Sequence, residues 1–320
     1  MLPIVRARSS QRSVNWLVFM KKRARRILPP YFGALIVTIT LFLIVPELSN
    51  HHIGEWSKSV PAISIGSVIS HILLIHNYSP DWQYSINHPM WSVATEWQIY
   101  MFFPLFVWVW SRFGATRLLL VGLSIHVSLT YLLAIFWPNH NPWPPQFFFL
   151  FCLGMSVAAY CYSSSPELTE QSGIARPWGT RAISLFLATV ITNGILLDRG
   201  QQVSDFLIGG ASACALIYLT QNVRQRKRPK LLIALEWKPL VELGKFSYSL
   251  YLMHAPILAL FYLLAQTLRL GPVSFQIFIL TVGIFGSVLI SYCFFLIIER
   301  PFINSRNFNS KVIAKQKRNH

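Results

Sequence analysis

Long apolar stretches alternate with short polar connections along most of the chain. A helix that crosses the hydrocarbon core of a bilayer needs about 20 consecutive, mostly apolar residues. Stretches of this character predict membrane-spanning helices at 27–45, 91–110, 117–137, 146–162, 182–197, 205–221, 244–267 and 273–298. We therefore predict an all-α fold, a polytopic membrane helix bundle of about eight spans.

A further apolar stretch, 60–77, is interrupted by polar residues, and the basic residues of the chain decide its placement. If it crosses the membrane and the N-terminus is cytoplasmic, 18 of the 28 Lys and Arg residues lie outside. If it does not cross, only Lys58, Arg199 and Arg269 lie outside. Cytoplasmic loops are enriched in Lys and Arg. We therefore predict that 60–77 lies at or dips into the outer face, and that both termini are cytoplasmic.

The composition supports a membrane protein. Hydrophobic residues make up 53% of the chain and charged residues 12%, whereas soluble domains are about 25% charged. An ordinary soluble enzyme and a disordered chain are both excluded. The net charge of +17 follows mostly from the predicted topology, so we expect no nucleic-acid partner. The four cysteines lie in apolar stretches without a CxxC spacing, and we expect no metal site.

Glu96 is the clearest candidate functional residue, because an ionisable side chain inside a span is costly. It belongs to the segment His88-Pro-Met-Trp-Ser-Val-Ala-Thr-Glu-Trp-Gln-Ile-Tyr100. If this segment is helical, His88, Ser92, Glu96 and Tyr100 share one face. That face would carry the imidazole, hydroxyl, carboxylate and phenol groups that serve proton transfer. The alternative is that Glu96 lies near the interface, where it is solvated or paired with a basic residue.

A second candidate segment is Phe246-Ser-Tyr-Ser-Leu-Tyr-Leu-Met-His-Ala-Pro256. On a helix, Ser247, Tyr251 and His254 would share a face. His254 lies within a predicted span, so it should face protein or a wet cavity rather than lipid. A core histidine with satisfied hydrogen bonds is the alternative interpretation.

The basic segment before the first span contains Arg23 and Arg26, which form an R-x-x-R pair. Arginine holds phosphate groups through bidentate hydrogen bonds. The alternative is an ordinary cytoplasmic anchor that also contacts anionic lipid. The segment Ile298-Glu-Arg-Pro-Phe302 is interpreted as a helix terminus, where Pro301 ends the last span.

These four segments, in this order, resemble acyltransferase family 3. Members of that family are integral membrane proteins that transfer acyl groups, often acetyl, to sugars of surface polysaccharides, lipopolysaccharide and related glycans. The second segment resembles the family's hPlWSLsvEeqfY motif, and the third resembles its iSYslYLwHwPi motif. The resemblance covers about residues 15 to 303, and the matching stretches are Arg23–Pro29, His88–Tyr100, Phe246–Pro256 and Glu299–Pro301.

The N-terminal end departs from the family pattern. Family members normally begin with two further spans, and the first carries an arginine followed about ten residues later by a histidine thought to be catalytic. This chain reaches its R-x-x-R pair within 26 residues and has no histidine before His51. We therefore expect either a truncated copy or a degenerate member. Eight predicted spans and two missing ones agree with the roughly ten spans of full members.

The resemblance implies an acyl-CoA donor, acetyl-CoA in most members, that reaches the cytoplasmic face of a bacterial inner membrane. Arg23 and Arg26 would then contact the donor's phosphates. The acceptor would be a glycan or glycolipid, and membrane lipid would be the other partner. The chain would comprise a basic cytoplasmic segment (1–26), an acyltransferase-3-like transmembrane domain (27–300) and a basic cytoplasmic tail (301–320).

The resemblance also assigns the acyl-transfer centre. Glu96 and Ser92 would shape it, and Tyr251 and His254 would support it from the penultimate span. Acyl transfer needs a base for the sugar hydroxyl and donors for the oxyanion. The family's N-terminal histidine is the expected base, and Glu96, His88 or His254 could take its place if geometry and pKa allow.

Two other functions compete with an O-acyltransferase. A non-catalytic remnant of the family would keep the fold and bind only donor, lipid or a partner. A transporter or polysaccharide flippase would show repeated halves with broken helices at matching positions, and no such repeat is evident.

Overall fold

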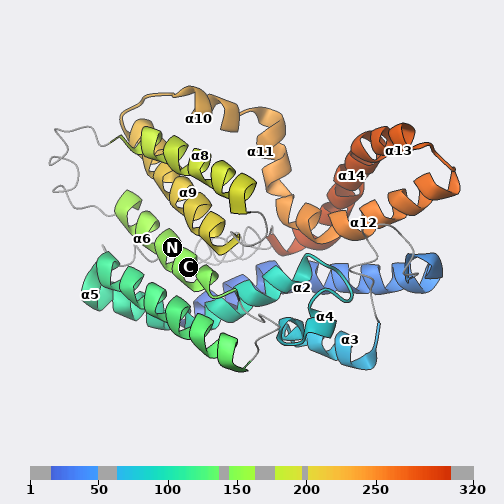
Figure 1. Cartoon of the computed structure of the whole chain (residues 1–320), viewed down its shortest axis with the longest axis horizontal. Helices are drawn as coiled ribbons and strands as arrows, with labels where there is room; N and C mark the ends of the chain where they lie inside the picture. The colour runs from blue at the N-terminus through green and yellow to red at the C-terminus, as the bar shows by residue number, and fades with distance from the viewer. Residues whose placement is uncertain (1–15, 50–62, 137–143, 163–176, 197–200, 304–320) are drawn as a thin grey trace, which may run out of the picture. The chain divides into compact units, whose positions relative to one another are not determined.

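The computed structural model describes residues 16–49, 63–136, 144–162, 177–196 and 201–303, and within these ranges every regular element is helical (Figure 1). The predicted all-α fold is therefore confirmed. The predicted N-terminal segment and C-terminal tail lie partly outside the described residues, at 1–15 and 304–320. Residues 60–62, 137 and 197 of the predicted apolar stretches also lie outside them.

Five helical stretches in these ranges are long and apolar enough to cross a membrane. They are α2 (Trp16–Ile44), α5 (Met90–Phe136), most of α9 (Gln201–Arg224), α12 (Ser247–Thr267) and the continuous stretch Pro272–Ile303. The shorter α6 (Gln146–Tyr162) is also apolar, and α8 (Trp178–Leu196) matches a further predicted span. Each predicted span thus coincides with a helix, as a polytopic bundle requires.

Helix α5 contains two predicted spans. Its 47 residues would extend about 70 Å, more than twice the thickness of the hydrocarbon core. Gly114 interrupts it with φ 85° and ψ 179°. Among the amino acids, glycine adopts this conformation without a steric cost. The kink therefore separates the stretches predicted at 91–110 and 117–137.

The doubtful stretch at 60–77 forms no long helix. Its longest element is α3 (Ile65–Ile72), whose eight residues extend about 12 Å. Ser64 caps it, and the hydroxyls of Ser64 and Ser67 each accept from the other's backbone N–H. Short turns follow, η3 (His76–Tyr78) and α4 (Pro80–Gln83). A helix of this length cannot cross about 30 Å of hydrocarbon.

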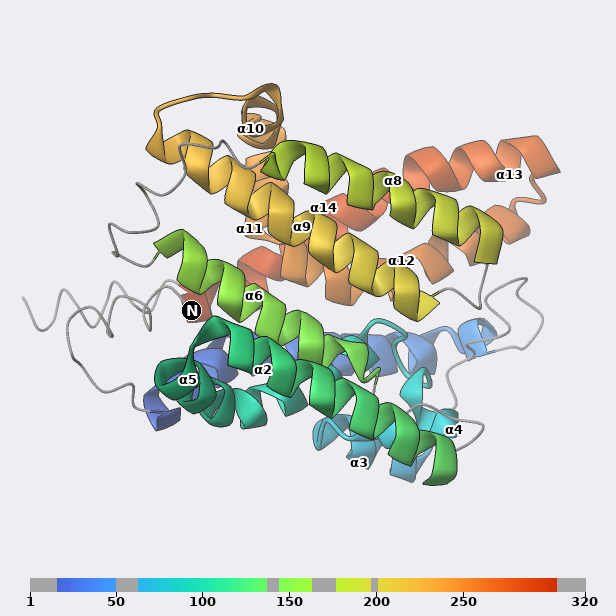
Figure 2. The same cartoon turned by 60° about the vertical axis from the view of Figure 1, so that its left-hand side comes forward.

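The chain forms two compact units. Unit 1 contains the residues of α5 beyond Tyr100, together with α6, α8, α9 and α10 (Lys230–Leu235). Helices α8 and α9 lie side by side, and α6 packs against α9 (Figure 2). The amide of Gln146 in α6 donates to Asp205 in α9 at 2.8 Å, which joins two polar residues inside this unit.

Unit 2 contains residues 17–100 and 238–320, and it holds all four motif segments. Its elements include α2, α3, the first turns of α5, α11 (Lys238–Lys245) and α12. Its last helix runs through α13 (Pro272–Phe278), η5 (Ile279–Gly283), α14 (Ile284–Phe294) and η6 (Phe295–Glu299). Helices α12 and α14 lie side by side. The buried face of α2 recurs at helical spacing at Tyr31, Ala34, Leu35, Thr38 and Phe42, so it packs as one stripe.

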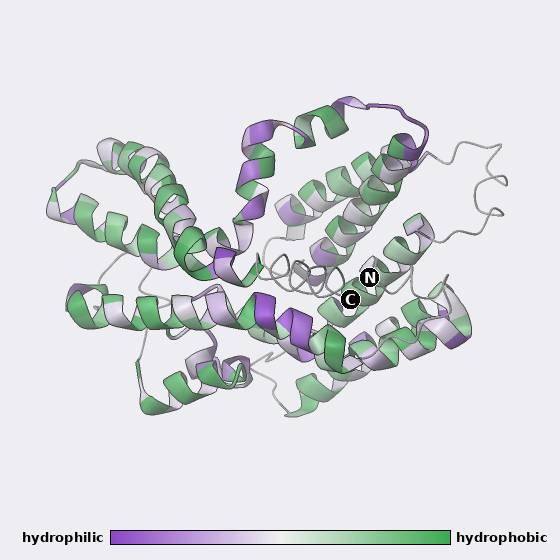
Figure 3. Cartoon of the chain, turned by 180° about the vertical axis from the view of Figure 1, so that it is seen from behind, coloured by the Kyte–Doolittle hydropathy of each residue, from purple (hydrophilic) through white to green (hydrophobic). Residues whose placement is uncertain are grey.

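Polar residues are concentrated in a few places. Figure 3 shows hydrophobic residues along most of the helices, and hydrophilic residues gathered at the start of α2, in the connection before α10 and along α11. Large apolar side chains such as Ile44, Ile195 and Phe285 are more than 70% exposed. Exposed apolar surface of this kind is what contact with lipid requires.

Candidate functional site

The start of α5 differs from the sequence prediction. The helix begins at Met90, so His88 lies in the turn before it and does not belong to the helical face. Ser92, Glu96 and Tyr100 remain on that face at successive turns. The predicted stripe of four groups is therefore wrong at His88, because the helix starts after Pro89 rather than at the histidine.

Asn87 fixes the turn that carries His88. Its side chain is 3% exposed and donates to the carbonyl of Leu252 at 2.8 Å and to the hydroxyl of Thr38 at 3.3 Å. The ring of His88 stacks on Tyr84, with centroids 4.4 Å apart and planes 10° from parallel. These contacts tie the turn to α2 and α12, so the position of His88 is determined even though it is outside the helix.

Glu96 reaches the arginine pair of α2 through one phenol. The hydroxyl of Tyr100 donates to Glu96 Oε1, and the guanidinium of Arg23 lies 5.0 Å from the centroid of the Tyr100 ring. The charges of Glu96, Arg23 and Arg26 all act on the Tyr100 hydroxyl. We name Glu96, Tyr100, Arg23 and Arg26 the arginine cluster.

Glu299 joins the same region, where it contacts Ser249, a partner that the sequence did not indicate. It is 2% exposed and accepts a hydrogen bond from the hydroxyl of Ser249, and the charge of Arg26 acts on it. The π-helical turn η6 ends at this residue, and π turns occur frequently at functional sites. The segment interpreted as a helix terminus thus contributes a buried carboxylate. An acidic residue at the end of an apolar span was the signal that could have identified it.

A second group of side chains lies around Ser92, one turn nearer the start of α5 than Glu96. The hydroxyls of Ser92 and Tyr251 are hydrogen-bonded to each other, and each lies 3.1 Å from the carbonyl of Pro89. His88 and His254 are close enough for their charges to interact. Partial burial, together with the positive charge that His254 can carry, lowers the pKa of His88, so its imidazole is neutral near pH 7. We name His88, Ser92, Tyr251 and His254 the imidazole cluster.

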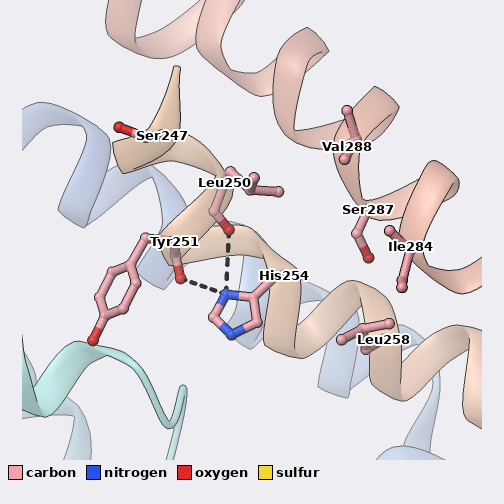
Figure 4. Close-up of a pocket in the computed structure, with 8 residues that line it drawn as sticks. All are labelled: Ser247, Leu250, Tyr251, His254, Leu258, Ile284, Ser287 and Val288. Carbon is pink, nitrogen blue, oxygen red and sulfur yellow. Dashed lines mark hydrogen bonds between the residues drawn. The ribbon is translucent and has the colours of Figure 1, made fainter. Parts of the chain in front are cut away.

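The backbone of α12 determines the tautomer of His254. Its Nδ1 lies 2.8 Å from the carbonyl oxygen of Tyr251 and 3.2 Å from that of Leu250 (Figure 4). A carbonyl accepts hydrogen bonds and cannot donate, so Nδ1 carries the proton in the neutral ring. The lone pair is then on Nε2, at the edge of the ring away from these carbonyls. His254 is therefore arranged to act as a proton acceptor.

A cavity of about 400 Å³ lies between α12 and α14 beside His254 (Figure 4). Helix α12 contributes Ser247, Leu250, Tyr251, His254 and Leu258. Helix α14 contributes Ile284, Ser287 and Val288. The surface of these walls is almost wholly apolar. We name this cavity the α12–α14 groove.

The sequence matches the profile of a known family, described as an acyltransferase domain, over residues 9–294. The chain belongs to the acyltransferase 3 family. No curated protein and no solved structure matches it. Family membership agrees with the resemblance carried by the four segments, and it identifies the chain as a membrane protein of an acyltransferase family.

In this acyltransferase 3 family member, one helix face connects the two clusters. Ser92 and Glu96 are four residues apart on α5, a rise of about 6 Å. The arginine cluster supplies positive charge for an anionic group, and the imidazole cluster supplies a proton acceptor and two hydroxyls. Within the described residues, no group of three or more His, Cys, Asp or Glu side chains could hold a metal ion.

Proposed function

We propose that this protein is an O-acyltransferase that moves an acyl group from acyl-CoA to a sugar hydroxyl. The acceptor would be a surface polysaccharide or lipopolysaccharide, and the site would be a bacterial inner membrane with both termini cytoplasmic. The observation that carries the proposal is the His254 ring. Two backbone carbonyls orient it, and its centroid lies 6.0 Å from that of the Tyr251 ring, whose hydroxyl is bonded to Ser92. The chain belongs to an acyltransferase family.

The donor would bind at the arginine cluster. Arg23 and Arg26 would hold the phosphates of CoA through charge-assisted hydrogen bonds. The Tyr100 hydroxyl donates to Glu96, and the Tyr100 ring lies against the Arg23 guanidinium. Glu96 would therefore act on the donor through Tyr100 and Arg23, as a positioning residue.

Acyl transfer would take place at the imidazole cluster. Nε2 of His254 would accept the proton of the sugar hydroxyl while the hydroxyl oxygen attacks the thioester carbonyl carbon. The hydroxyls of Ser92 and Tyr251 would donate to the oxyanion of the tetrahedral intermediate. Collapse of that intermediate breaks the C–S bond, and the departing CoA thiolate takes the proton from His254. These steps leave the ester, free CoA and a neutral histidine.

Thioester turnover tests the proposal without knowledge of the acceptor. The full chain is reconstituted in vesicles with acetyl-CoA, and release of CoA thiol is followed with and without glycan extracted from cells. We expect His254→Gln to lower the rate at least 100-fold, the lower end of what a general base contributes. His126→Gln makes the same change at a histidine of unit 1 that packs on Phe206, and it should leave the rate within about twofold of the unsubstituted protein.

The proposal is contradicted if His254→Gln keeps the full rate. If the unsubstituted chain releases no thiol and also fails to bind acetyl-CoA, a non-catalytic role without a donor site is the better account. Binding of acetyl-CoA without turnover would support the alternative that the chain keeps the donor site but performs no transfer.

A further inference from the structure

We infer that the α12–α14 groove binds the hydrocarbon tail of the transferred acyl group, and that it favours tails longer than acetyl. This inference rests on the proposed function and names the substrate class of that same site. It starts from the place of His254, whose ring lines an almost wholly apolar groove between two membrane-spanning helices.

The walls of the groove suit an alkyl chain. Leu250, Leu258, Ile284 and Val288 present hydrocarbon to it. The hydroxyl of Ser287 donates to the carbonyl of Gly283 at 2.7 Å, so its polar group is already bonded to the helix backbone. Small-molecule sites are mostly apolar, with a few polar groups that set orientation. Here the polar groups, at Tyr251 and His254, occupy one level of the groove.

The position of His254 along the groove gives the bound acyl tail a direction. Leu258 lies one turn beyond His254, about 6 Å along the helix axis, and Ser247 lies about 10 Å before it. The hydroxyl of Tyr248, next to Ser247, donates to the carbonyl of Ile27 at 3.1 Å, and Ile27 directly follows Arg26. The start of α12, where the groove begins at Ser247, therefore contacts α2 next to Arg26. A thioester carbonyl at His254 would direct its tail toward Leu258 and Ile284.

The far end of the groove is bounded by close helix packing. A Cβ atom added at Gly283 would lie 3.3 Å from Cδ2 of Leu258, so the two helices approach each other there. The π-helical turn η5 ends at Gly283, immediately before Ile284. The groove can therefore hold an acyl tail of limited length, which would end against Leu258.

The volume exceeds what an acetyl group needs. One water molecule occupies about 30 Å³ of the liquid, and a methyl group is of similar size. An acetyl group at His254 would leave most of a groove of about 400 Å³ empty. Each methylene that enters an apolar site contributes roughly fourfold in affinity, so longer tails should be used better until the groove is full.

A donor series tests the inference. Acetyl-, butanoyl-, hexanoyl- and octanoyl-CoA are supplied to the full chain in vesicles, and both kcat/KM and equilibrium Kd are measured. We expect kcat/KM to rise by roughly fourfold per methylene from acetyl to hexanoyl. Ile284→Trp fills the far end and should lower the hexanoyl-to-acetyl ratio at least tenfold. Leu258→Ala lengthens the groove and should move the preferred tail toward octanoyl.

Leu289→Trp is the matched control, since Leu289 lies on the same helix, is 64% exposed and is not among the residues that line the groove. It should leave the chain-length profile unchanged. The inference is overturned if neither groove variant alters the chain-length profile. It is also overturned if the two variants alter only the lipid that co-purifies with the protein. Failure of the proposed function can be distinguished from failure of the inference. Turnover would then be missing for every donor, while the dependence of Kd on tail length would still report on the groove.

Discussion

At the scale of single residues, the link from Glu96 through Tyr100 to Arg23 joins α5 to the basic start of α2. The sequence offered two interpretations of Glu96, a place in the acyl-transfer centre or an interfacial carboxylate paired with a basic residue. In the structure Glu96 accepts from Tyr100, whose ring lies against Arg23, and Glu96 is one turn from Ser92. Its hydrogen-bond partner is four residues away on its own helix, a spacing that helical periodicity predicts.

Removal of the Glu96 charge should abolish acyl transfer. Glu96→Gln keeps the shape of the side chain, but a neutral amide no longer offsets the charge of Arg23. Transfer from acetyl-CoA to glycan is measured together with membrane insertion, which we expect to be intact. Glu242→Gln is the control, because Glu242 is exposed and pairs with Lys245 on α11. Full transfer by Glu96→Gln would remove the role assigned to this residue.

A pair of buried histidines should make the protein sensitive to acid. The rings of His71 and His76 stack with centroids 3.8 Å apart, and both residues are 0% exposed. Burial lowers the pKa of His71 to about 4, and burial together with the His71 charge lowers the pKa of His76 to about 3. As the pH is lowered, these two histidines take up protons near pH 6.5 in the unfolded chain, but only at a much lower pH in the folded chain. The stability contributed by this pair is therefore complete above about pH 6.5 and falls as the pH drops toward about 4.

Thermal unfolding in detergent at about pH 7 and about pH 5 measures this effect. We expect a lower Tm at about pH 5 than at about pH 7. The difference should be smaller for His76→Phe, which retains a flat ring but cannot take up a proton. An equal fall in Tm for both proteins would show that the histidine pair is not responsible for the acid sensitivity.

At the scale of elements, hydropathy located the helices but not their ends. Helix α2 begins at Trp16, eleven residues before the predicted span at 27–45, because Lys, Arg and Ala are good helix formers and can extend a helix into the aqueous phase. The two spans of α5 are joined at Gly114 rather than separated by a loop. The approach of α14 to α12 depends on which glycines face a neighbour, and an apolar pattern carries no such information.

Gly286, the glycine of α14, should tolerate a side chain poorly. A Cβ atom there would lie 2.3 Å from the ring of Phe261 on α12, so Gly286→Ala requires the Phe261 ring or the helices to shift. Overpacking of this kind costs about 1–3 kcal/mol. Gly194→Ala in α8 is the matched control, because an added Cβ meets nothing within 4 Å and alanine favours the helix. Thermal unfolding should show a lower Tm for Gly286→Ala alone, and an unchanged Tm would contradict the close packing.

At the scale of the whole molecule, four segments far apart in the sequence meet within unit 2. Their order predicted the family, and the family profile confirmed it. The sequence could not divide their residues between two clusters, because Arg23, Glu96 and Glu299 come together through contacts that no local pattern contains. The transmembrane domain at 27–300 stays a prediction, and the chain forms two compact units. Hydropathy has no signal for that division.

Membrane topology can be measured with two engineered cysteines in a cysteine-free background. If 60–77 does not cross, Asp81→Cys lies outside and Lys238→Cys lies in the cytoplasm. An impermeant maleimide should then label Asp81→Cys in intact cells, and Lys238→Cys only after permeabilisation. The reverse pattern would mean that 60–77 crosses the membrane.

The most direct test of the central claim follows label from donor to glycan. Membrane vesicles that contain the full chain receive radiolabelled acetyl-CoA at the cytoplasmic face, and label is counted in the extracted glycan. We expect label to accumulate with the unsubstituted chain and to fall at least tenfold with Arg23→Ala combined with Arg26→Ala, when both insert with the same topology. Equal labelling by the two proteins would contradict a donor site at the arginine cluster. An absence of label and of donor binding in both would contradict the acyltransferase function itself.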